Sequence, residues 1–295
     1  MKRQHGIKDG HQVSNLRLGL PSKGRLAESS AELLMQAGLS FRRHDRSLFA
    51  RVRELPVDIK FLRTKDIPVL CAEGAIDMGI TGGDLVEEAG VDLKTRLALG
   101  IGKCKLAVCV SKDASFQSPA DLANCRIATS FPQVTERYFQ QFGTTVHLVP
   151  LSGSVEIMIE LGVAEGIVDL VQTGSTLVAN HLRVLTDMGQ YETVLVQNQA
   201  GHQADIADRI VRRLEGVVIA RDWSLLEYNV PRVKLVDAEK ITPGFNSPTI
   251  NTLEDQAWYA VQVMVKRKEL IEIMDRLEAI GATAILETRI NNCRL

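Results

Sequence analysis

Short apolar runs recur along the first two thirds of the chain, and polar or glycine-containing segments separate them. Apolar runs of about four to eight residues with such boundaries are typical of buried strands. We predict strands, two of them continuing into a loop or turn, at Leu16–Leu20, Val57–Leu62, Ala75–Asp84, Cys104–Ser111, Arg126–Pro132, Val146–Pro150, Ile167–Val171 and Thr193–Val196.

Segments between these strands carry apolar residues at helical spacing. We predict helices at Ser29–Ala37, Arg63–Glu73, Leu85–Ala89, Val134–Phe142 and Ala204–Leu214. Two more are predicted around the strand Ile167–Val171. One begins after Ser154, a good N-cap residue, and ends at Gly162, and the other extends from Leu177 to Met188.

Alternation of strands and helices predicts α/β lobes, and within residues 104–192 it predicts a parallel sheet. The β-branched strand Cys104–Ser111 is expected to carry the chain into a second lobe, and Thr193–Val196 to return it to the first. A cleft between two such lobes is where a ligand would bind.

The pattern changes from about Val217. Gly216–Ala220 and Ser224–Tyr228 are short and apolar, and alternation predicts strands at Val233–Val236, Ala257–Val265 and Ala284–Thr288. An amphipathic helix is predicted at Lys268–Ile280, with Leu270, Ile273, Met274 and Leu277 facing inward. These elements predict a small α+β accessory module.

Composition is that of an ordinary globular enzyme. The 295 residues, 45% hydrophobic and 24% charged, favour two or three domains. A net charge of -1 gives no general attraction to nucleic acid or to acidic membranes. The polar N-terminus predicts a disordered tail rather than a signal peptide, and no apolar run approaches the ~20 residues of a membrane helix. Five cysteines without a CxxC pair indicate reduced thiols in a cytoplasm.

The stretch Gly153–Leu177 combines local structure with chemistry. A buried strand is followed by Thr173, Gly174, Ser175 and Thr176 and then by a predicted helix start, an arrangement that suits a phosphate. Such a loop is equally consistent with a capped helix that binds nothing. Asp169 favours a site, because a carboxylate inside a buried strand is costly unless something binds it. From the strand's end it can reach ribose hydroxyls or a phosphate-bound Mg²⁺.

The same stretch resembles the signature of the ATP phosphoribosyltransferase family. The similarity rests on residues in fixed register: Glu156, Gly162, Ala164, Ile167, Asp169, Leu170, Thr173, Gly174, Thr176 and Leu177. Purine-type phosphoribosyltransferases place two adjacent acids before a similar loop, whereas only Asp169 is acidic here. The resemblance implies that the loop from Thr173 to Thr176 holds the 5-phosphate of phosphoribosyl pyrophosphate. It places Glu156, Asp169 and Leu170 among the substrate-binding residues, with Asp169 beside the ribose.

The resemblance also implies roles for basic residues elsewhere in the chain. The family opens with a similar strand and a Pro-x-Lys/Ser-Gly-Arg-Leu turn over the substrate phosphates, which implies Lys23 and Arg25. Arg63 is implied as a pyrophosphate contact, and Arg46 is singled out from a run of otherwise solvated arginines. The stretch GITGGD ending at Asp84 also has close counterparts in the family. It is explained either as a strand-to-helix turn or as part of the catalytic site.

The C-terminal part resembles the regulatory domain of the long-form enzyme, which is ferredoxin-like and binds histidine. Positions that match its histidine contacts are Asn229, Thr249, Met264 and Ala284. Asn229 replaces an expected aspartate, so the contact with the histidine ammonium group is weakened. The domain implies that the chain needs no separate regulatory subunit.

The resemblance covers roughly residues 16–295 and implies a two-lobed, periplasmic-binding-protein-like α/β core with a ferredoxin-like domain. Its expected parts are a tail at 1–15, a first lobe at 16–103 with 193–220, a second lobe at 104–192, and a regulatory domain at 221–295. The implied reaction joins N1 of ATP to C1 of the ribose with Mg²⁺, mainly bound through substrate phosphates. The implied assembly is a dimer that forms a hexamer.

Other functions remain open on the residues alone. A two-lobed chain can be a ligand sensor without catalysis, a phosphoribosyltransferase for another base, or a degenerate regulatory paralogue. The intact Lys23-Gly24-Arg25 turn and the loop after Asp169 argue against a degenerate copy.

Overall fold

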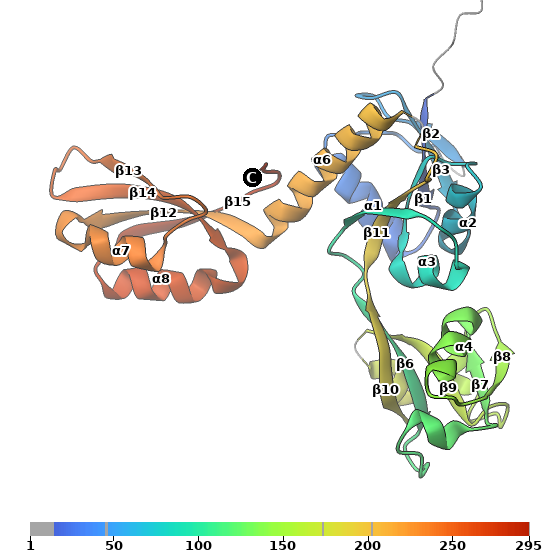
Figure 1. The fold of residues 1–295 in the computed structure, drawn as a ribbon. Coiled ribbons are helices and arrows are strands. Elements are labelled where there is room, and N and C mark those ends of the chain that lie inside the picture. The colour runs from blue at the N-terminus through green and yellow to red at the C-terminus, as the bar shows by residue number, and fades with distance from the viewer. Residues whose placement is uncertain (1–14, 45–46, 173, 202, 295) are drawn as a thin grey trace, which may run out of the picture. The chain divides into compact units, whose positions relative to one another are not determined.

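The structure is a computed structural model that describes residues 15–294 apart from 45–46, 173 and 202. The chain forms two compact units (Figure 1). One contains the residues up to 30 together with 40–207, and the other contains 31–39 and the residues from 208 onward. Within the described residues, no helix has the length and apolar character that crossing a membrane requires.

A six-stranded sheet forms the first part of the larger unit. Its strands, in spatial order, are β2 (Phe49–Arg51), β3 (Val57–Leu62), β1 (Leu16–Pro21), β4 (Met78–Gly82), β11 (Thr193–Gln197) and β5 (Lys94–Ala98). Its helices are α1 (Arg25–Gln36), α2 (Ile67–Ala72) and α3 (Gly83–Ala89). The central strand β1 is almost wholly buried, as expected for an apolar strand that pairs in parallel with neighbours on both sides.

A five-stranded sheet forms the second part of this unit. Its strands, in spatial order, are β10 (Leu182–Tyr191), β6 (Cys104–Ser111), β9 (Gly166–Val171), β7 (Arg126–Thr129) and β8 (His147–Pro150), with helices α4 (Pro132–Gln141) and α5 (Ser175–Ala179). The sheet is mixed rather than parallel as predicted, because β6 runs antiparallel to both β9 and β10. The chain leaves the first sheet after β5 and returns through β10 and β11 (Figure 1).

The predicted helix from Leu177 to Met188 is wrong beyond Ala179. Residues 182–191 instead form β10, whose pairing with β6 contains two bulges. The bulges fall at Leu185 and Met188, and both side chains pack on the hydrophobic cluster that contains Val108. Each bulge adds one residue to the strand's repeat of two. Apolar residues three apart therefore face the same way, which imitates a helical period.

The helix predicted after Ser154 is reduced to a 3₁₀ turn at Val155–Ile157. Ser154 adopts a left-handed φ of 52°, and its side chain makes no capping hydrogen bond. An N-cap residue normally has an extended backbone, so this residue cannot start an α-helix in the expected way.

The smaller unit contains a four-stranded antiparallel sheet and two packed helices. The elements follow the order β12 (Trp223–Pro231), α7 (Leu235–Ile241), β13 (Thr249–Thr252), β14 (Trp258–Lys266), α8 (Leu270–Ala279) and β15 (Thr283–Arg289). Their spatial order, β13-β14-β12-β15, together with this βαββαβ sequence is the ferredoxin-like topology. The predicted fold class, a two-lobed α/β core with a ferredoxin-like α+β domain, is thereby confirmed.

Two C-terminal predictions are wrong. Val233–Val236, predicted as a strand, forms a 3₁₀ turn and the start of α7, and Val233 and Val236 are 88% and 62% exposed. The helix predicted at Ala204–Leu214 continues to Asp222 as α6 (Ala204–Asp222). Gly216 lies inside it because Cys293 passes close by: a Cβ there would lie 2.6 Å from the Cys293 carbonyl oxygen.

One contact between helices α3 and α4 is made by a carboxylate. Glu88 of α3 accepts hydrogen bonds from the backbone N–H groups of Gln133 and Val134, at 3.1 and 3.0 Å. These are first-turn groups of α4, which have no partner inside the helix. Nearby, the Tyr191 hydroxyl donates to Glu87 at 2.7 Å. An element of the first sheet thus caps a helix of the second.

We expect Glu88→Ala to lower the free energy of unfolding by about 1 kcal/mol, because two helix N–H groups lose their acceptor. Urea denaturation measures the change. Glu136→Ala, on the exposed side of α4, is the matched control and should change the value by less than about 0.5 kcal/mol. Equal effects of the two substitutions would contradict the capping role of Glu88.

Candidate functional site

Two chain turns from different sheets come together at the candidate site. After β1, Gly24 takes a left-handed φ of 83°, a conformation that glycine adopts without strain, and α1 begins at Arg25. The Arg25 guanidinium donates to Oε1 of Gln172, just beyond β9, at 3.1 Å. The basic turn and the end of β9 are therefore in contact.

Arg43 fixes a further segment beside this turn. Its guanidinium donates to the carbonyl oxygens of Ser22, at 2.7 Å, and Ser47, at 3.1 Å. Its central carbon also lies 4.0 Å from the centre of the Phe61 ring, a cation–π contact. The sequence alone did not separate Arg43 from its neighbours in the arginine run. Arg46, which it singled out, lies outside the described residues.

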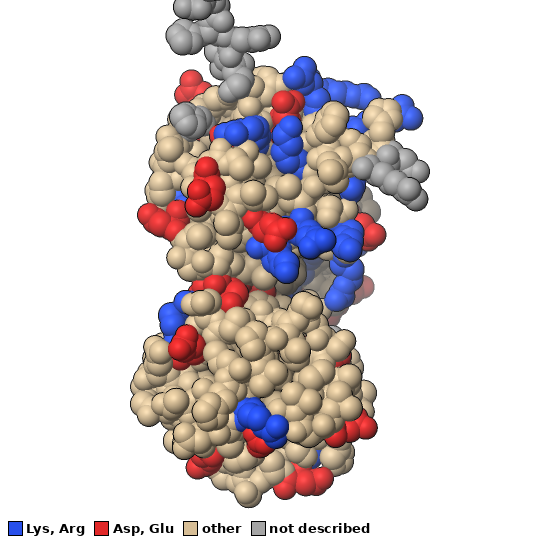
Figure 2. Space-filling view, turned by 90° about the vertical axis from the view of Figure 1, so that its right-hand side faces the viewer, with Lys and Arg blue, Asp and Glu red and all other residues tan. Residues whose placement is uncertain are grey.

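Basic side chains are concentrated on the six-stranded part of the larger unit. Figure 2 shows Lys and Arg gathered on its upper body, whereas the lower body is mostly uncharged with scattered acidic groups. Exposed basic residues of this part include Lys23, Arg25, Arg42, Arg43, Arg51, Arg53 and Arg63. A local basic surface attracts anions even though the whole chain is close to neutral.

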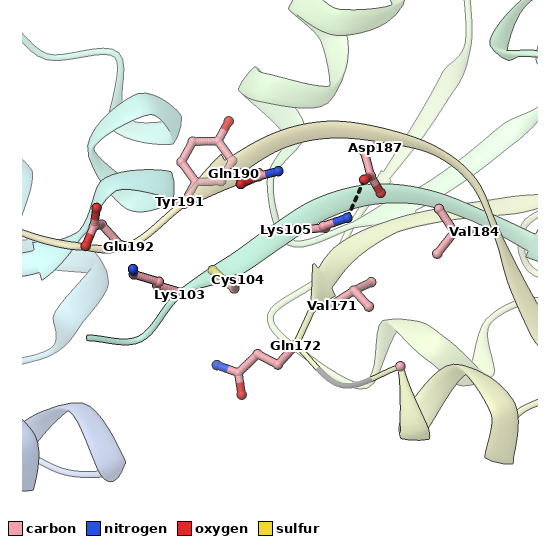
Figure 3. Close-up of a pocket in the computed structure, with 11 residues that line it drawn as sticks. Lys103, Cys104, Lys105, Val171, Gln172, Val184, Asp187, Gln190, Tyr191 and Glu192 are labelled. Carbon is pink, nitrogen blue, oxygen red and sulfur yellow. Dashed lines mark hydrogen bonds and ion pairs between the residues drawn. The ribbon is translucent and has the colours of Figure 1, made fainter. Parts of the chain in front are cut away.

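Two adjoining cavities open where the turns meet. They have volumes of about 430 and 580 Å³ and share Cys104 and Gln172. The smaller cavity is lined by Arg25, Leu26, Ser29, Thr64, Gly82, Asp84, Leu85, Ile101, Gly102, Cys104, Leu170, Gln172 and Thr193. The larger includes Lys103, Gly174 and the ion pair between Lys105 and Asp187, which are 2.7 Å apart (Figure 3).

Strand β9 extends beyond the end of its parallel neighbour β7, and the loop begins at the carboxyl end of β9. Pairing with β7 ends at Val168, and Asp169, Leu170 and Val171 pair only with β6. Gly174 then takes a φ of 74° and starts α5. Helix α5 has five residues, so an anion at its start would meet first-turn N–H groups rather than a long helix dipole.

Asp169 is held in an unfavourable environment for a charged carboxylate. Burial raises its pKa, and the negative charge of Glu156 raises it further, against one hydrogen bond from the Leu170 N–H at 2.8 Å. Glu156 is thus close enough for its charge to act on Asp169. A pair of carboxylates that repel each other gains stability when a cation or hydroxyl donors lie between them.

The structure brings only some of the expected catalytic-lobe residues to the cavities. Arg25, Leu170 and Gly174 line them. The remaining described members, namely Lys23, Arg63, Glu156, Asp169, Ser175 and Thr176, do not. Asp169 is next to Leu170 in a strand, so the two side chains point to opposite faces of the sheet. Thr173 lies outside the described residues.

Two residues at the cavities were missed by sequence reasoning. Gln172 bonds to Arg25, and Lys103 lines the larger cavity. Buried Asp84, which lines the smaller cavity, ends the glycine-rich stretch GITGGD that the sequence had left open as a turn or as part of the catalytic site. Gln172 and Lys103 carried no usable signal, because their positions follow from strand pairing between distant segments.

In the smaller unit, the expected histidine contacts lie on the sheet face away from the helices. The register places Asn229 opposite Ala260, Thr249 opposite Gln262, and Met264 opposite Leu225. Asn229 and Met264 are consequently four residues apart along the strands, or about 13 Å. Ala284 has a left-handed φ of 49°, close to an irregularity in the pairing of β12 with β15.

Metal binding by protein groups alone finds no support among residues 15–294 where they are described. They contain no group of three or more His, Cys, Asp or Glu side chains able to hold a metal ion. The five cysteines, all in this part, are free thiols, and burial raises the pKa of Cys109 to about 12. A thiol with so high a pKa is a poor metal ligand or nucleophile.

Comparison with known families matches nearly the whole chain. Residues 63–216 match the family described as ATP phosphoribosyltransferase, and residues 220–292 match its C-terminal domain. The ATP phosphoribosyltransferase of Rhodopirellula baltica is 64% identical over 96% of this chain and 94% of its own length. That of Saccharopolyspora erythraea is 41% identical over 95% of this chain and its full length.

A solved structure also matches the fold of the larger part of the chain. It is titled as an ATP phosphoribosyl transferase (HisG:HisZ) complex from Thermotoga maritima. The alignment has a TM-score of 0.59 and 27% identity, and it covers 68% of this chain and 98% of the matched one.

We expect Asp169→Asn to raise the free energy of unfolding at neutral pH. Folding raises the pKa of Asp169 above its ordinary value of 3.8. The contribution of Asp169 to the free energy of unfolding therefore falls as the pH rises from 3.8 through the raised pKa. Above the raised pKa this destabilisation is constant, and below pH 3.8 it is absent. Thermal melting across pH should show a gain near pH 7 that is lost in acid.

Asp121→Asn is the matched control with the opposite sign. Hydrogen bonds from the Gln117 and Ser118 N–H groups lower the pKa of Asp121, so its contribution is present above its ordinary pKa and is lost as pH falls through the lowered one. The control should therefore lose stability at neutral pH. A destabilised Asp169→Asn protein would show that Asp169 supports the fold.

Proposed function

The chain belongs to the ATP phosphoribosyltransferase family, the first enzyme of histidine biosynthesis, and from this membership we propose its reaction in detail. It transfers the phosphoribosyl group of phosphoribosyl pyrophosphate to N1 of ATP and releases pyrophosphate. The observation that carries the proposal is the 64% identity over 96% of the chain. The contact between Arg25 and Gln172 supports it, because it joins the basic turn to the strand that bears Asp169.

The phosphoribosyl group is assigned to the end of β9. Thr173, Gly174, Ser175 and Thr176 hold the 5-phosphate through backbone N–H groups and hydroxyls. Asp169 accepts hydrogen bonds from the ribose hydroxyls, with Glu156 beside it and Leu170 next in the strand. Burial raises the pKa of the Asp169 carboxylate, because its charged form is poorly solvated. Hydroxyl donors of a bound ribose would offset part of that desolvation cost.

The pyrophosphate is assigned to the basic side chains around the turn after β1. Lys23, Arg25 and Arg63 are exposed there, and Arg46 would join them from the arginine run. Mg²⁺ normally keeps several waters and binds through substrate phosphates with one or two carboxylates. Asp169 and Glu156 fit that requirement, and the ion would neutralise charge on the departing pyrophosphate.

The protein contributes to this reaction mainly by positioning the two substrates and by stabilising charge. The N1 lone pair of adenine bonds to C1 of the ribose as the C1–O bond breaks and its electrons leave with pyrophosphate. Holding two reactants in line is worth several kcal/mol in general, on the order of 7–11 for well-aligned reactions. Fixed cations near the leaving group act on charge that develops only in the transition state.

We assign residues 16–103 with 193–220 and residues 104–192 to the two catalytic lobes, and residues 221–295 to regulation. The C-terminal domain would bind histidine near Asn229, Thr249, Met264 and Ala284 and inhibit the enzyme. Because the chain carries this domain itself, we expect it to need no separate regulatory subunit. The assembly is a homo-oligomer of dimers up to a hexamer, and its place is the cytoplasm, where both substrates occur.

Asp169→Ala and Thr176→Val should each abolish most turnover while the fold survives, because one removes the ribose acceptor and the other a phosphate donor. The assay follows pyrophosphate release, or the absorbance of phosphoribosyl-ATP, with both substrates and Mg²⁺. Val178→Ala, on an exposed position of the same helix, is the control. Full activity in the Thr176→Val protein would remove that hydroxyl from the phosphate site.

Asn229→Asp should strengthen inhibition by histidine, since a carboxylate on the open sheet face can pair with its ammonium group. A charge-assisted hydrogen bond of this kind is worth about 1.5–3 kcal/mol, or roughly 10- to 100-fold in the inhibition constant. Turnover without histidine should not change. Inhibition unaltered by Asn229→Asp, or absent from both proteins, would contradict the assignment of the histidine site.

A further inference from the structure

Asp84 is a buried carboxylate without a cationic partner. It lies in the first turn of α3 and is 6% exposed. Its oxygens accept hydrogen bonds from its own backbone N–H and from that of Leu85, and no Lys, Arg or His of the described chain pairs with it. Burial accordingly raises its pKa. Such a group destabilises the fold unless a ligand supplies what the protein does not.

The chain makes room for this carboxylate. Gly82 precedes α3, and a Cβ at that position would lie 2.1 Å from Oδ1 of Asp84. Any other residue there would force the carboxylate out of its place. Asp66 occupies the corresponding end of α2 without lining a cavity, so an aspartate at a helix start does not by itself require such a recess.

The cavity beside Asp84 combines apolar side chains with a buried carboxylate. Leu26, Leu85, Ile101 and Leu170 give it apolar walls, and Asp84 provides a buried anionic acceptor. Arg25 also lines this cavity and is bonded to Gln172, next to the phosphate loop. Apolar walls with a few placed polar groups are the usual form of a small-molecule pocket.

We propose that Asp84 accepts a hydrogen bond from the 6-amino group of the adenine and so orients N1 toward the ribose. This inference rests on the proposed function, which it extends to the residue that recognises the acceptor base. N1 and the 6-amino nitrogen are attached to the same ring carbon, so holding one fixes the direction of the other.

The same contact favours the transition state. As the N1 lone pair forms the bond to C1, the electrons of the broken C1–O bond leave with pyrophosphate, and positive charge spreads from N1 to the 6-amino nitrogen. That nitrogen keeps both hydrogens during the step and gives one up afterwards to solvent. A carboxylate beside it interacts more strongly with the charged ring than with neutral adenine. Asp84 therefore contributes to kcat as well as to KM.

The test compares ATP with purine riboside triphosphate, which keeps N1 but lacks the 6-amino group. Calorimetry should show that the wild-type protein prefers ATP by about 10- to 100-fold, the range for a hydrogen bond to a charged group. Asp84→Ala should lose this preference through weaker ATP binding, with the affinity for the analogue unchanged. Asp66→Ala is the matched control and should keep the wild-type preference.

A second variant keeps the test decisive if Asp84→Ala does not fold. Asp84→Asn preserves the shape and adds a donor, so it should bind inosine triphosphate, whose 6-oxygen is an acceptor, about tenfold more tightly than the wild type does. ATP turnover should fall in kcat, since the amide lacks the stabilising charge. An unchanged ATP preference in folded Asp84→Ala, or unchanged inosine triphosphate binding in Asp84→Asn, would overturn the proposal.

Turnover of the wild-type protein separates this inference from the proposed function. An active wild type whose Asp84 variants keep the wild-type selectivity would refute only the role of Asp84. A folded wild type without turnover would refute the proposed reaction, and the calorimetric preference would still decide whether Asp84 recognises an amino group.

Discussion

Backbone pairing along β6 determines where the candidate site lies. This strand pairs antiparallel with β9 on one side and with β10 on the other, over nearly its whole length. Pairing with β9 carries Asp169 past the end of β7 and sets the start of the phosphate loop. The first residue of β6, Cys104, lines both cavities. A shift of one residue in this register would turn Asp169 and Leu170 to the opposite faces.

Carboxylates that support the fold differ from those near the candidate site in their hydrogen-bond partners. Asp77, buried at the start of β4, receives three hydrogen bonds from Arg17, including one from its backbone, so its charge is compensated inside the protein. Asp84 is also buried and Asp169 is half-buried, but only backbone N–H groups serve them, and burial raises the pKa of each. Perturbed, uncompensated groups near a cavity are characteristic of binding sites. The cost that burial of these charges imposes on folding is the reason that Asp169→Asn is expected to raise the free energy of unfolding at neutral pH.

The sequence was sufficient for features that depend on neighbouring residues. The Lys23-Gly24-Arg25 turn, the strand that bears Asp169 and the glycine turn before Asp84 each follow from residues within about ten positions. It failed where distant pairing overrides local periodicity. The bulges at Leu185 and Met188 exist only because β6 lies alongside. Gln172 and Lys103 gained their positions in the same way, and no local pattern marks either of them.

The positions of Asn229 and Met264 restrict the proposed histidine site of the C-terminal domain. Both lie on the open sheet face, but the register separates them by about 13 Å along the strands. One histidine centred on Asn229 would therefore leave Met264 near the edge of its reach. The opposite face is filled by Leu226, Tyr228 and Val230 packed with α8, so no ligand enters from that side. The proposed histidine site is therefore restricted to the open sheet face.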